Sequence, residues 1–128
     1  MRILLDTHTL LWFYMGDVQL SSAARAAISD PGNDKLVSPA SYWELAIKVS
    51  RGNYILMEPY DEFIQHALID NGFAILPIEP RHTSALIALP YHHKDPFDRL
   101  LIAQGLVEAM PIVSTDPKLD LYSIKRLW

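Results

Sequence analysis

The chain has 128 residues, of which half are hydrophobic and a fifth are charged, and its formal net charge at pH 7 is -4. This balance is typical of one globular domain and excludes a disordered chain, and no apolar run approaches the length of a membrane span. The absence of cysteine excludes disulfides, thiolate metal sites and a cysteine nucleophile, so we expect a single cytoplasmic domain over residues 1–128 that does not contact membranes.

The first half of the chain predicts two strands and three helices. The apolar run at 3–5 is of the kind that makes a buried strand, and it ends at Asp6. Ser38 followed by Pro39 is a strong helix start, because serine accepts from free amides and proline has no amide to lose in the first turn. The expected elements are a strand at 3–5, a helix at 9–14, a helix at 23–28 capped by Ser21 or Ser22, a strand at 35–37 and a helix from 39 to about Arg51.

The second half repeats the same alternation. Asp95 followed by Pro96 combines a helix cap with a first-turn proline, which predicts a long helix to about Ala109. Asn71 and Gly72 end the preceding helical segment by their turn chemistry. The expected elements are a helix from Pro59 or Asp61 to 71–72, a strand at 73–76, a helix at 80–89, the long helix from 95, a strand at 112–113 and a short last strand within 121–128.

Short apolar strands that alternate with helices predict an α/β fold, a three-layer α/β/α sandwich around a central parallel sheet with right-handed crossovers. In such sheets ligands bind beyond the carboxyl ends of the strands. Asp6 and Asp116 are each the first acidic residue after a predicted strand. If these two strands are neighbours, the two carboxylates share one edge of the sheet.

Acidic residues on four separate elements could meet at that edge. Asp95 and Asp98 lie on one face of the first turn of the long helix, and Glu44 lies in the second turn of its helix. Two carboxylates about 5 Å apart repel by roughly 3 kcal/mol at an effective dielectric constant near 20, so a cluster needs a cation. Mg²⁺ or Mn²⁺ is the natural candidate, because hard divalent ions prefer carboxylate oxygens and can activate a water for attack on a phosphodiester.

Each acidic residue also has a local structural interpretation. Asp6 and Asp95 can simply cap the helices that follow them, and Asp98 is a favourable charge at the third helical position. Asp116 can form a turn, and Glu44 can pair with Lys48 four residues later or with Arg51. Taken singly, these structural roles are favoured for every one of them. Their joint placement at strand ends and helix starts favours a shared functional site.

The net negative charge argues against binding nucleic acid by phosphate contacts alone, unless bound cations offset the acidic residues. The histidines lack the helical spacing of a zinc site, and packing beside Glu44 is favoured for Trp43 over stacking on a nucleobase. A solvated loop is favoured for His92, His93, Lys94 and Arg99, with phosphate contacts as the alternative. Arg99 could instead orient Asp98 or its neighbours. The basic residues near the acidic positions are Lys48, Arg51, His92, His93, Lys94, Arg99 and Lys118.

Four sequence motifs carry a family resemblance: LDT at 5–7, the helix start at 38–44, the run DPFDRLLIAQ at 95–104 and STD at 114–116. Together they resemble the PIN-domain family, and among its members the VapC-type toxins. The resemblance implies a metal-dependent endoribonuclease that cleaves single-stranded RNA as the toxin of a type II toxin–antitoxin pair. It also implies a VapB-like antitoxin that occludes the groove, and a homodimer. The residues it implies are Asp6, Glu44, Asp98 and Asp116 as metal ligands, Asp95 as a further ligand, and Ser114 as the group that positions a water or metal-bound ligand.

Other classes of protein fit less well. A receiver-like signalling module needs an acceptor aspartate after the third strand, where this chain has Leu76 and Pro77. A phosphatase of the haloacid dehalogenase type needs an aspartate two residues after Asp6, where this chain has His8. A PIN fold that only binds RNA or a protein partner remains the main alternative. The complete acidic set argues against it, because an inactive copy has no need of carboxylates that repel one another.

Overall fold

The structure is a computed structural model that describes all residues from 1 to 128. It contains five strands and six α-helices together with one π-helical and one 3-10 segment. None of the helices has both the length and the apolar character that a membrane crossing needs. In chain order the elements are β1 (Arg2–Leu5), α1 (Thr7–Met15), α2 (Ser22–Ser29), β2 (Asp34–Val37), α3 (Pro39–Ser50), α4 (Tyr60–Ile64), η1 (Gln65–Ile69), β3 (Ala74–Ile75), α5 (Pro80–Ile87), α6 (Pro96–Val107), β4 (Ile112–Val113), η2 (Pro117–Leu121) and β5 (Arg126–Leu127).

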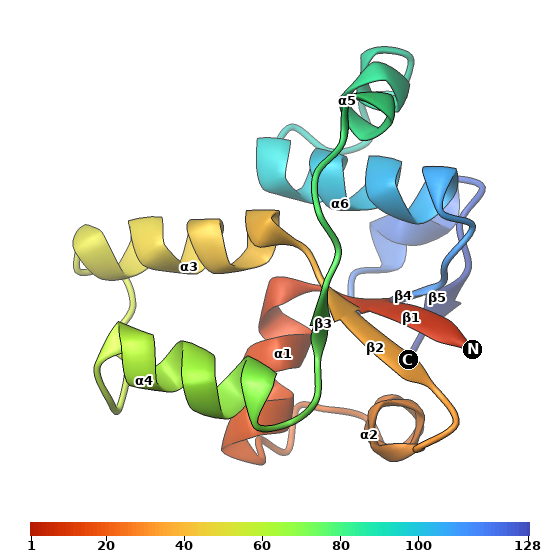
Figure 1. The fold of residues 1–128 in the computed structure, drawn as a ribbon. Helices are drawn as coiled ribbons and strands as arrows, with labels where there is room; N and C mark the ends of the chain where they lie inside the picture. The colour runs from red at the N-terminus through yellow and green to blue at the C-terminus, as the bar shows by residue number, and fades with distance from the viewer.

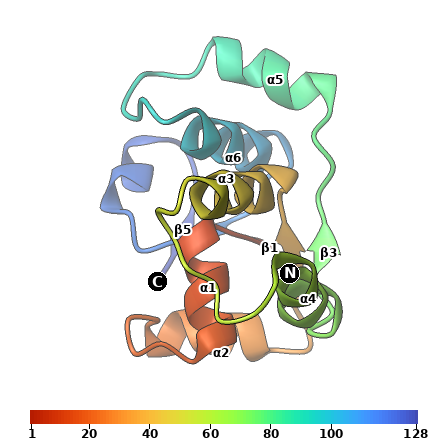
Figure 2. The same cartoon turned by 90° about the vertical axis from the view of Figure 1, so that its left-hand side faces the viewer.

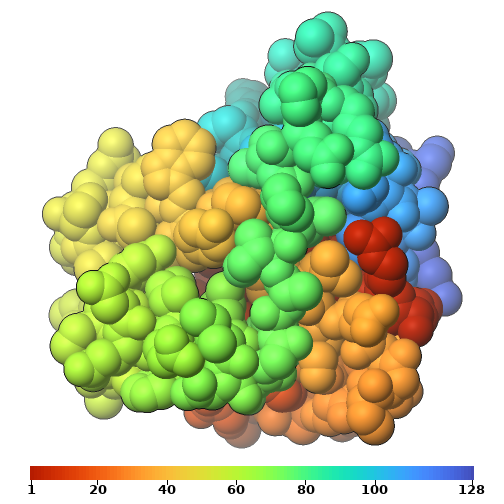
Figure 3. Space-filling view, viewed as in Figure 1, coloured from red at the N-terminus to blue at the C-terminus, as the bar shows by residue number.

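The strands form one parallel sheet in the order β3-β2-β1-β4-β5. Helices cover both faces of this sheet, which confirms the predicted α/β/α sandwich: α5 and α6 lie on one side, and α1, α2 and α4 on the other (Figures 1 and 2). β1 pairs with β4, so the strands that precede Asp6 and Asp116 are neighbours. β3 forms one edge of the sheet, and its chain runs over the surface from α4 to α5 (Figure 3).

The alternation of side chains along the strands divides the interior into two cores. In β1, Ile3 and Leu5 pack with α1, α2 and α4, whereas Leu4 packs with α6 on the opposite face. All three side chains are fully buried. Strand geometry explains this division, because successive residues point to opposite faces of a sheet. α3 contacts both α1 and α6, so it connects the two layers beyond the carboxyl end of β2.

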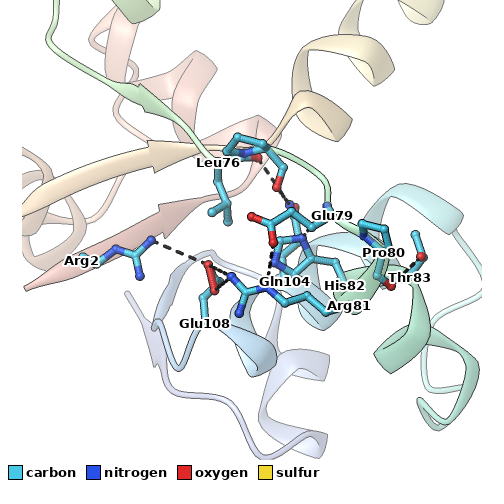
Figure 4. Close-up of polar contacts among 10 residues, drawn as sticks. Arg2, Leu76, Glu79, Pro80, Arg81, His82, Thr83, Gln104 and Glu108 are labelled. Atoms are coloured by element: carbon cyan, nitrogen blue, oxygen red, sulfur yellow. Dashed lines mark hydrogen bonds and ion pairs between the residues drawn. The ribbon is translucent and has the colours of Figure 1, made fainter.

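Polar contacts attach the segment from β3 to α5 to the far end of α6 (Figure 4). The Arg81 guanidinium donates to Glu79 Oε2 at 2.8 Å and to both carboxylate oxygens of Glu108, at 2.9 and 2.7 Å. Gln104 is completely buried and donates to the carbonyl of Leu76 at 3.4 Å. These contacts fix the orientation of α6, whose first turn carries two of the predicted acidic residues.

The predicted elements agree with the structure except in two segments. The helix expected from 59 or 61 to 71–72 is α4 followed by the π-helical turn η1, which shifts the register of its second half. Residues 117–121 form the 3-10 helix η2, which was not predicted. The short last strand exists, at Arg126–Leu127, and it pairs with β4.

Ala109, just after α6, is the only non-glycine residue with a positive φ, at 52°. The left-handed conformation costs an L-residue steric energy that glycine avoids. We expect Ala109→Gly to stabilise the protein by about 1 kcal/mol, raising Tm by about 3 °C. Ala88 at the end of α5 is a matched control, because its φ is -92° and glycine there should lower Tm. Thermal unfolding of both variants checks the prediction, and a lower Tm for Ala109→Gly would contradict it.

Candidate active site

The candidate site lies where the order of the parallel strands reverses, between β1 and β4. Crossovers leave the sheet in opposite directions at such a point, which opens a crevice beyond the carboxyl ends of the strands. A cavity of about 310 Å³ occupies this position. Six of its lining residues are the site residues expected from the sequence: Asp6, Glu44, Asp95, Asp98, Ser114 and Asp116.

β1 and α3 supply the carboxylates on one side of the cavity. Asp6 follows β1 and caps α1, because its Oδ1 accepts from the Thr9 amide at 2.8 Å. Glu44 reaches from α3, where its Oε1 accepts from the Thr7 hydroxyl at 2.8 Å and its Oε2 lies 3.7 Å from Lys48 Nζ. The capping of α1 and the pairing with Lys48 predicted as structural roles are therefore both present. Asp6 and Glu44 nevertheless both line the cavity, and Asp6 Oδ2 makes no hydrogen bond within the protein.

The first turn of α6 supplies two more carboxylates. Asp95 is the cap predicted from the sequence, and its Oδ1 accepts from the amides of Phe97 and Asp98 at 2.8 and 3.1 Å. The Asp98 side chain makes no hydrogen bond within the protein. It is the one member of the acidic set whose two oxygens are both free for a ligand.

The pKa of Asp98 is raised from 3.8 to about 6. The residue is exposed at the mouth of the cavity, but the cavity walls remove water from around its carboxyl group, and this is the largest cause. The carboxylates of Asp95 and Glu44 add repulsion. In the metal-free protein the ionised carboxylates therefore repel one another, and a bound cation would relieve that repulsion.

Asp116 follows β4 and is held from two sides. Its Oδ1 accepts from the Lys118 amide at 3.0 Å, and its Oδ2 lies 2.6 Å from His93 Nε2. Burial raises the pKa of Asp116, but the hydrogen bonds from His93 and Lys118 outweigh burial, so the pKa lies below its usual range. The buried Ser114 hydroxyl accepts from the Asp116 amide at 3.1 Å, so Ser114 shapes the turn that carries Asp116.

The acidic residues surround the cavity without closing on one point. No three acidic or histidine side chains lie close enough together to ligate a single ion directly. Internal hydrogen bonds hold Asp6, Glu44, Asp95 and Asp116 against the walls, which accounts for their spread. The donor set nevertheless fits a hard divalent cation, because Mg²⁺ keeps several waters and takes only one or two protein carboxylates directly. Five carboxylates around a cavity of this size suit a hydrated ion.

Two of the basic residues, Arg99 and His93, are buried where the sequence predicts exposure. Arg99 was expected as a possible phosphate contact, but its side chain is 4% exposed and donates to backbone carbonyls. His93 is 8% exposed and contacts Asp116, so the expectation of a solvated loop is wrong at this residue. Nothing in the sequence distinguishes His93 from the exposed His92 beside it. Thr7 was also missed as a partner of Glu44, because the spacing along the chain gives no signal for it.

Trp43 is also in a different environment from the one favoured by the sequence. Its side chain is 59% exposed, so it is not mainly a packing residue. It makes an edge-to-face contact with Phe97 of the cavity wall, with ring centroids 5.1 Å apart. An apolar rim therefore lies beside the acidic residues.

Comparisons with known proteins agree on the fold. The sequence profile of the family described as "PIN domain" matches residues 3–125. No curated protein matches the chain in a sequence search. Three solved structures are similar at identities that show the fold alone, and all three are toxin–antitoxin complexes. They are VapBC2 from Rickettsia felis bound to a DNA fragment from their promoter (14% identity, 100% of both chains, TM-score 0.70), VapBC-1 from nontypeable Haemophilus influenzae (15%, 98% of this chain and 96% of that chain, 0.66) and FitAB bound to the IR36 DNA fragment (14%, 97% and 92%, 0.63).

Proposed function

The chain belongs to the PIN domain family, and on that premise we propose that it is a divalent-metal-dependent endoribonuclease. The observation that carries the proposal is the placement of five carboxylates around one cavity at the switch point of the sheet. Members of this family are typically Mg²⁺-dependent nucleases. The membership also removes the receiver-like and phosphatase alternatives, which require other folds and other acidic patterns.

Asp6, Glu44, Asp98 and Asp116 would hold Mg²⁺ or Mn²⁺, with Asp95 as a further ligand. When bound, the cation supplies charge neutralisation and an activated water for hydrolysis of the phosphodiester. The chain's own groups prepare the cavity for this chemistry. Asp98 provides the carboxylate with no competing protein contact, and Ser114 holds the turn of Asp116 while its own proton stays available to a water or phosphate.

Lys48 is the only lysine or arginine that lines the cavity. Its ammonium lies 3.7 Å from Glu44 and its side chain is 40% exposed, so it can turn from Glu44 to an incoming phosphate. A cation bound among the carboxylates would weaken its attraction to Glu44 and favour that movement. The proposed substrate is single-stranded RNA, since flexible strands can enter an open crevice of this size.

We further propose that the protein is the toxin of a type II toxin–antitoxin pair and forms a homodimer. The similarity of the whole chain to three toxin–antitoxin complexes supports this assignment. A VapB-like antitoxin would occlude the cavity, and an arginine of its tail would pair with the carboxylates. Its binding should compete with metal-dependent cleavage, because both need the same acidic residues.

Cleavage of labelled single-stranded RNA tests the enzymatic proposal. Protein stripped of metal should be inactive, should cleave after addition of Mn²⁺ or Mg²⁺, and should lose activity again in EDTA. A Glu44→Gln variant purified in parallel controls for contaminating nucleases and should show only background cleavage. Undiminished cleavage in EDTA would contradict the metal requirement. Metal binding without any cleavage would instead support an inactive PIN fold that serves as a binding protein.

Expression in growing cells tests the assignment as a toxin. Induction of the chain should arrest growth, and co-expression of the neighbouring reading frame should relieve the arrest. The Glu44→Gln variant is the matched control and should not arrest growth at equal protein levels. Normal growth with active, soluble wild-type protein would indicate a nuclease with another cellular role.

A further inference from the structure

The loop between α5 and α6 is held rigidly by one buried side chain. The Arg99 guanidinium donates to the carbonyls of Pro90 at 2.9 Å, Leu89 at 3.1 Å and His93 at 3.4 Å. It also lies over the Tyr91 ring, 3.8 Å from the ring centroid. Because hydrogen bonds to a charged donor are among the stronger ones in proteins, this loop has little freedom to move. The backbone of His93 is therefore fixed independently of the acidic residues.

The His93 side chain extends from this loop to the far wall of the cavity. Its Nε2 lies 2.6 Å from Asp116 Oδ2 and its Nδ1 lies 2.9 Å from the Tyr122 hydroxyl. The rings of His93 and Tyr122 also stack, with centroids 5.5 Å apart at an angle of 30°. Both residues are at least nine-tenths buried. The histidine is thus held on its two nitrogen atoms and on its face.

Asp116 and Tyr122 together favour one tautomer of His93, because the Asp116 carboxylate can only accept a hydrogen bond and so requires a proton on Nε2. The tyrosine hydroxyl lies 2.9 Å from His93 Nδ1 and 3.4 Å from the carbonyl of Pro90, so its shorter and stronger bond is to the histidine. When the hydroxyl donates to Nδ1, a neutral ring must carry its proton on Nε2. That proton points at Asp116, which accepts it.

We propose that His93 is a positioning residue that holds the carboxylate of Asp116 in one orientation for the metal site. The Lys118 amide already holds Asp116 Oδ1, and His93 Nε2 holds Oδ2, so the carboxylate cannot rotate about its last bond. Tyr122 acts through His93 by fixing its tautomer and ring plane. Outer contacts of this kind orient ligands and strengthen metal binding. The effect on metal binding rests on the proposed function. The predicted tautomer of His93 does not depend on that function.

Four variants separate positioning from simple packing. His93→Leu removes both hydrogen bonds but fills the space, and His93→Gln keeps a donor for Asp116 in place of Nε2. Tyr122→Phe removes only the hydroxyl that fixes the tautomer. His66→Ala, at an exposed histidine outside the cavity, is the matched control. Circular dichroism and thermal unfolding establish that each variant is folded before it is compared.

Mn²⁺ binding measured by calorimetry is the first readout. His93→Leu should weaken Mn²⁺ binding by about 10- to 100-fold, His93→Gln should recover most of the affinity, and His66→Ala should bind as the wild type does. Cleavage by His93→Leu should show a lower kcat with an unchanged KM for RNA. Wild-type affinity in His93→Leu, or no recovery in His93→Gln, would overturn the proposal.

The ring ¹⁵N shifts of His93 in the metal-free protein are the second readout. They should show the proton on Nε2 in the wild type and a mixture of tautomers in Tyr122→Phe. An Nε2 without a proton in the wild type would overturn the positioning geometry whatever the protein catalyses. If the wild type binds no Mn²⁺ but shows the expected tautomer, the metal-dependent function fails while the hydrogen-bonded arrangement is retained.

Discussion

Asp98→Asn should abolish cleavage and at the same time stabilise the metal-free protein. Asparagine has nearly the same shape but cannot offer a charged oxygen to a cation, so we expect a loss of at least about 100-fold in kcat, the size typical of losing one charge-stabilising group. The fold should be intact, because the Asp98 side chain makes no hydrogen bond that the variant would break. RNA cleavage and circular dichroism of the two proteins provide the measurement. Wild-type cleavage by the variant would remove Asp98 from the mechanism.

The gain in stability follows from the sign of the pKa shift. The folded protein raises the pKa of Asp98 from 3.8 to about 6, so between these values it binds more protons than the unfolded chain. Ionisation of Asp98 therefore lowers stability as the pH rises through this window, and the full penalty remains above about pH 6. Solvent screening at this open position reduces the expected gain of Asp98→Asn at pH 7 to about 1 kcal/mol.

Thermal unfolding in EDTA at pH 5 and at pH 7 measures this effect. The difference in Tm between Asp98→Asn and wild type should be larger at pH 7, and Mn²⁺ at pH 7 should raise the Tm of the wild type only. Asp61→Asn, on α4 and outside the cavity, is the control for a general effect of charge. Equal differences in Tm at both pH values would show that Asp98 ionises without penalty in the folded protein.

Arg99→Met is expected to be the most destabilising of the substitutions considered. Methionine has a similar length but no donors, so the carbonyls of Leu89, Pro90 and His93 lose their shared partner in a buried environment. Leaving several buried acceptors unsatisfied should cost about 3 kcal/mol. For a domain of this size that corresponds to a fall in Tm of about 10 °C. Arg99→Lys should recover only part of the loss, because an ammonium cannot reproduce the planar set of donors.

Urea unfolding of Arg99→Met, with Arg51→Met as an exposed control, measures this cost. The Arg51 variant should unfold within about 0.5 kcal/mol of the wild type, as is usual for surface substitutions. A change of that small size in Arg99→Met would mean that the carbonyls find other donors. Weaker Mn²⁺ binding in the Arg99 variant would be a second consequence, since His93 would lose its fixed backbone.

Local sequence patterns were sufficient to predict most elements and the sheet. The run at 3–5 can only be a short buried strand when Asp6 and a helix follow it, and Pro96 marks the start of α6 through its missing amide. The pairing of β1 with β4 could only be stated as a condition, because residues more than 100 positions apart meet through tertiary packing. The helix η2 was missed since Asp116 and Pro117 also suit a simple turn.

The acidic set was predictable because four of its members follow a strand or begin a helix, and Glu44 lies in the second turn of α3. The groups that support it were not. Arg99 lies at the start of the buried face of α6, where sequence alone cannot distinguish a buried arginine from one that reaches solvent. His93 and His92 are identical in type and adjacent in sequence, and only the loop fixed by Arg99 determines which of them turns inward.

The order of the strands also determines when this cavity can exist during synthesis. A ribosome that has released residues 1–110 has already delivered four of the five acidic residues, but not β4, the strand that places Asp116 beside Asp6. The nascent chain therefore has β2 on one side of β1 but lacks β4 on the other side, together with the turn that carries the fifth carboxylate. The proposed nuclease site is therefore incomplete in the nascent chain until β4 has emerged and paired with β1.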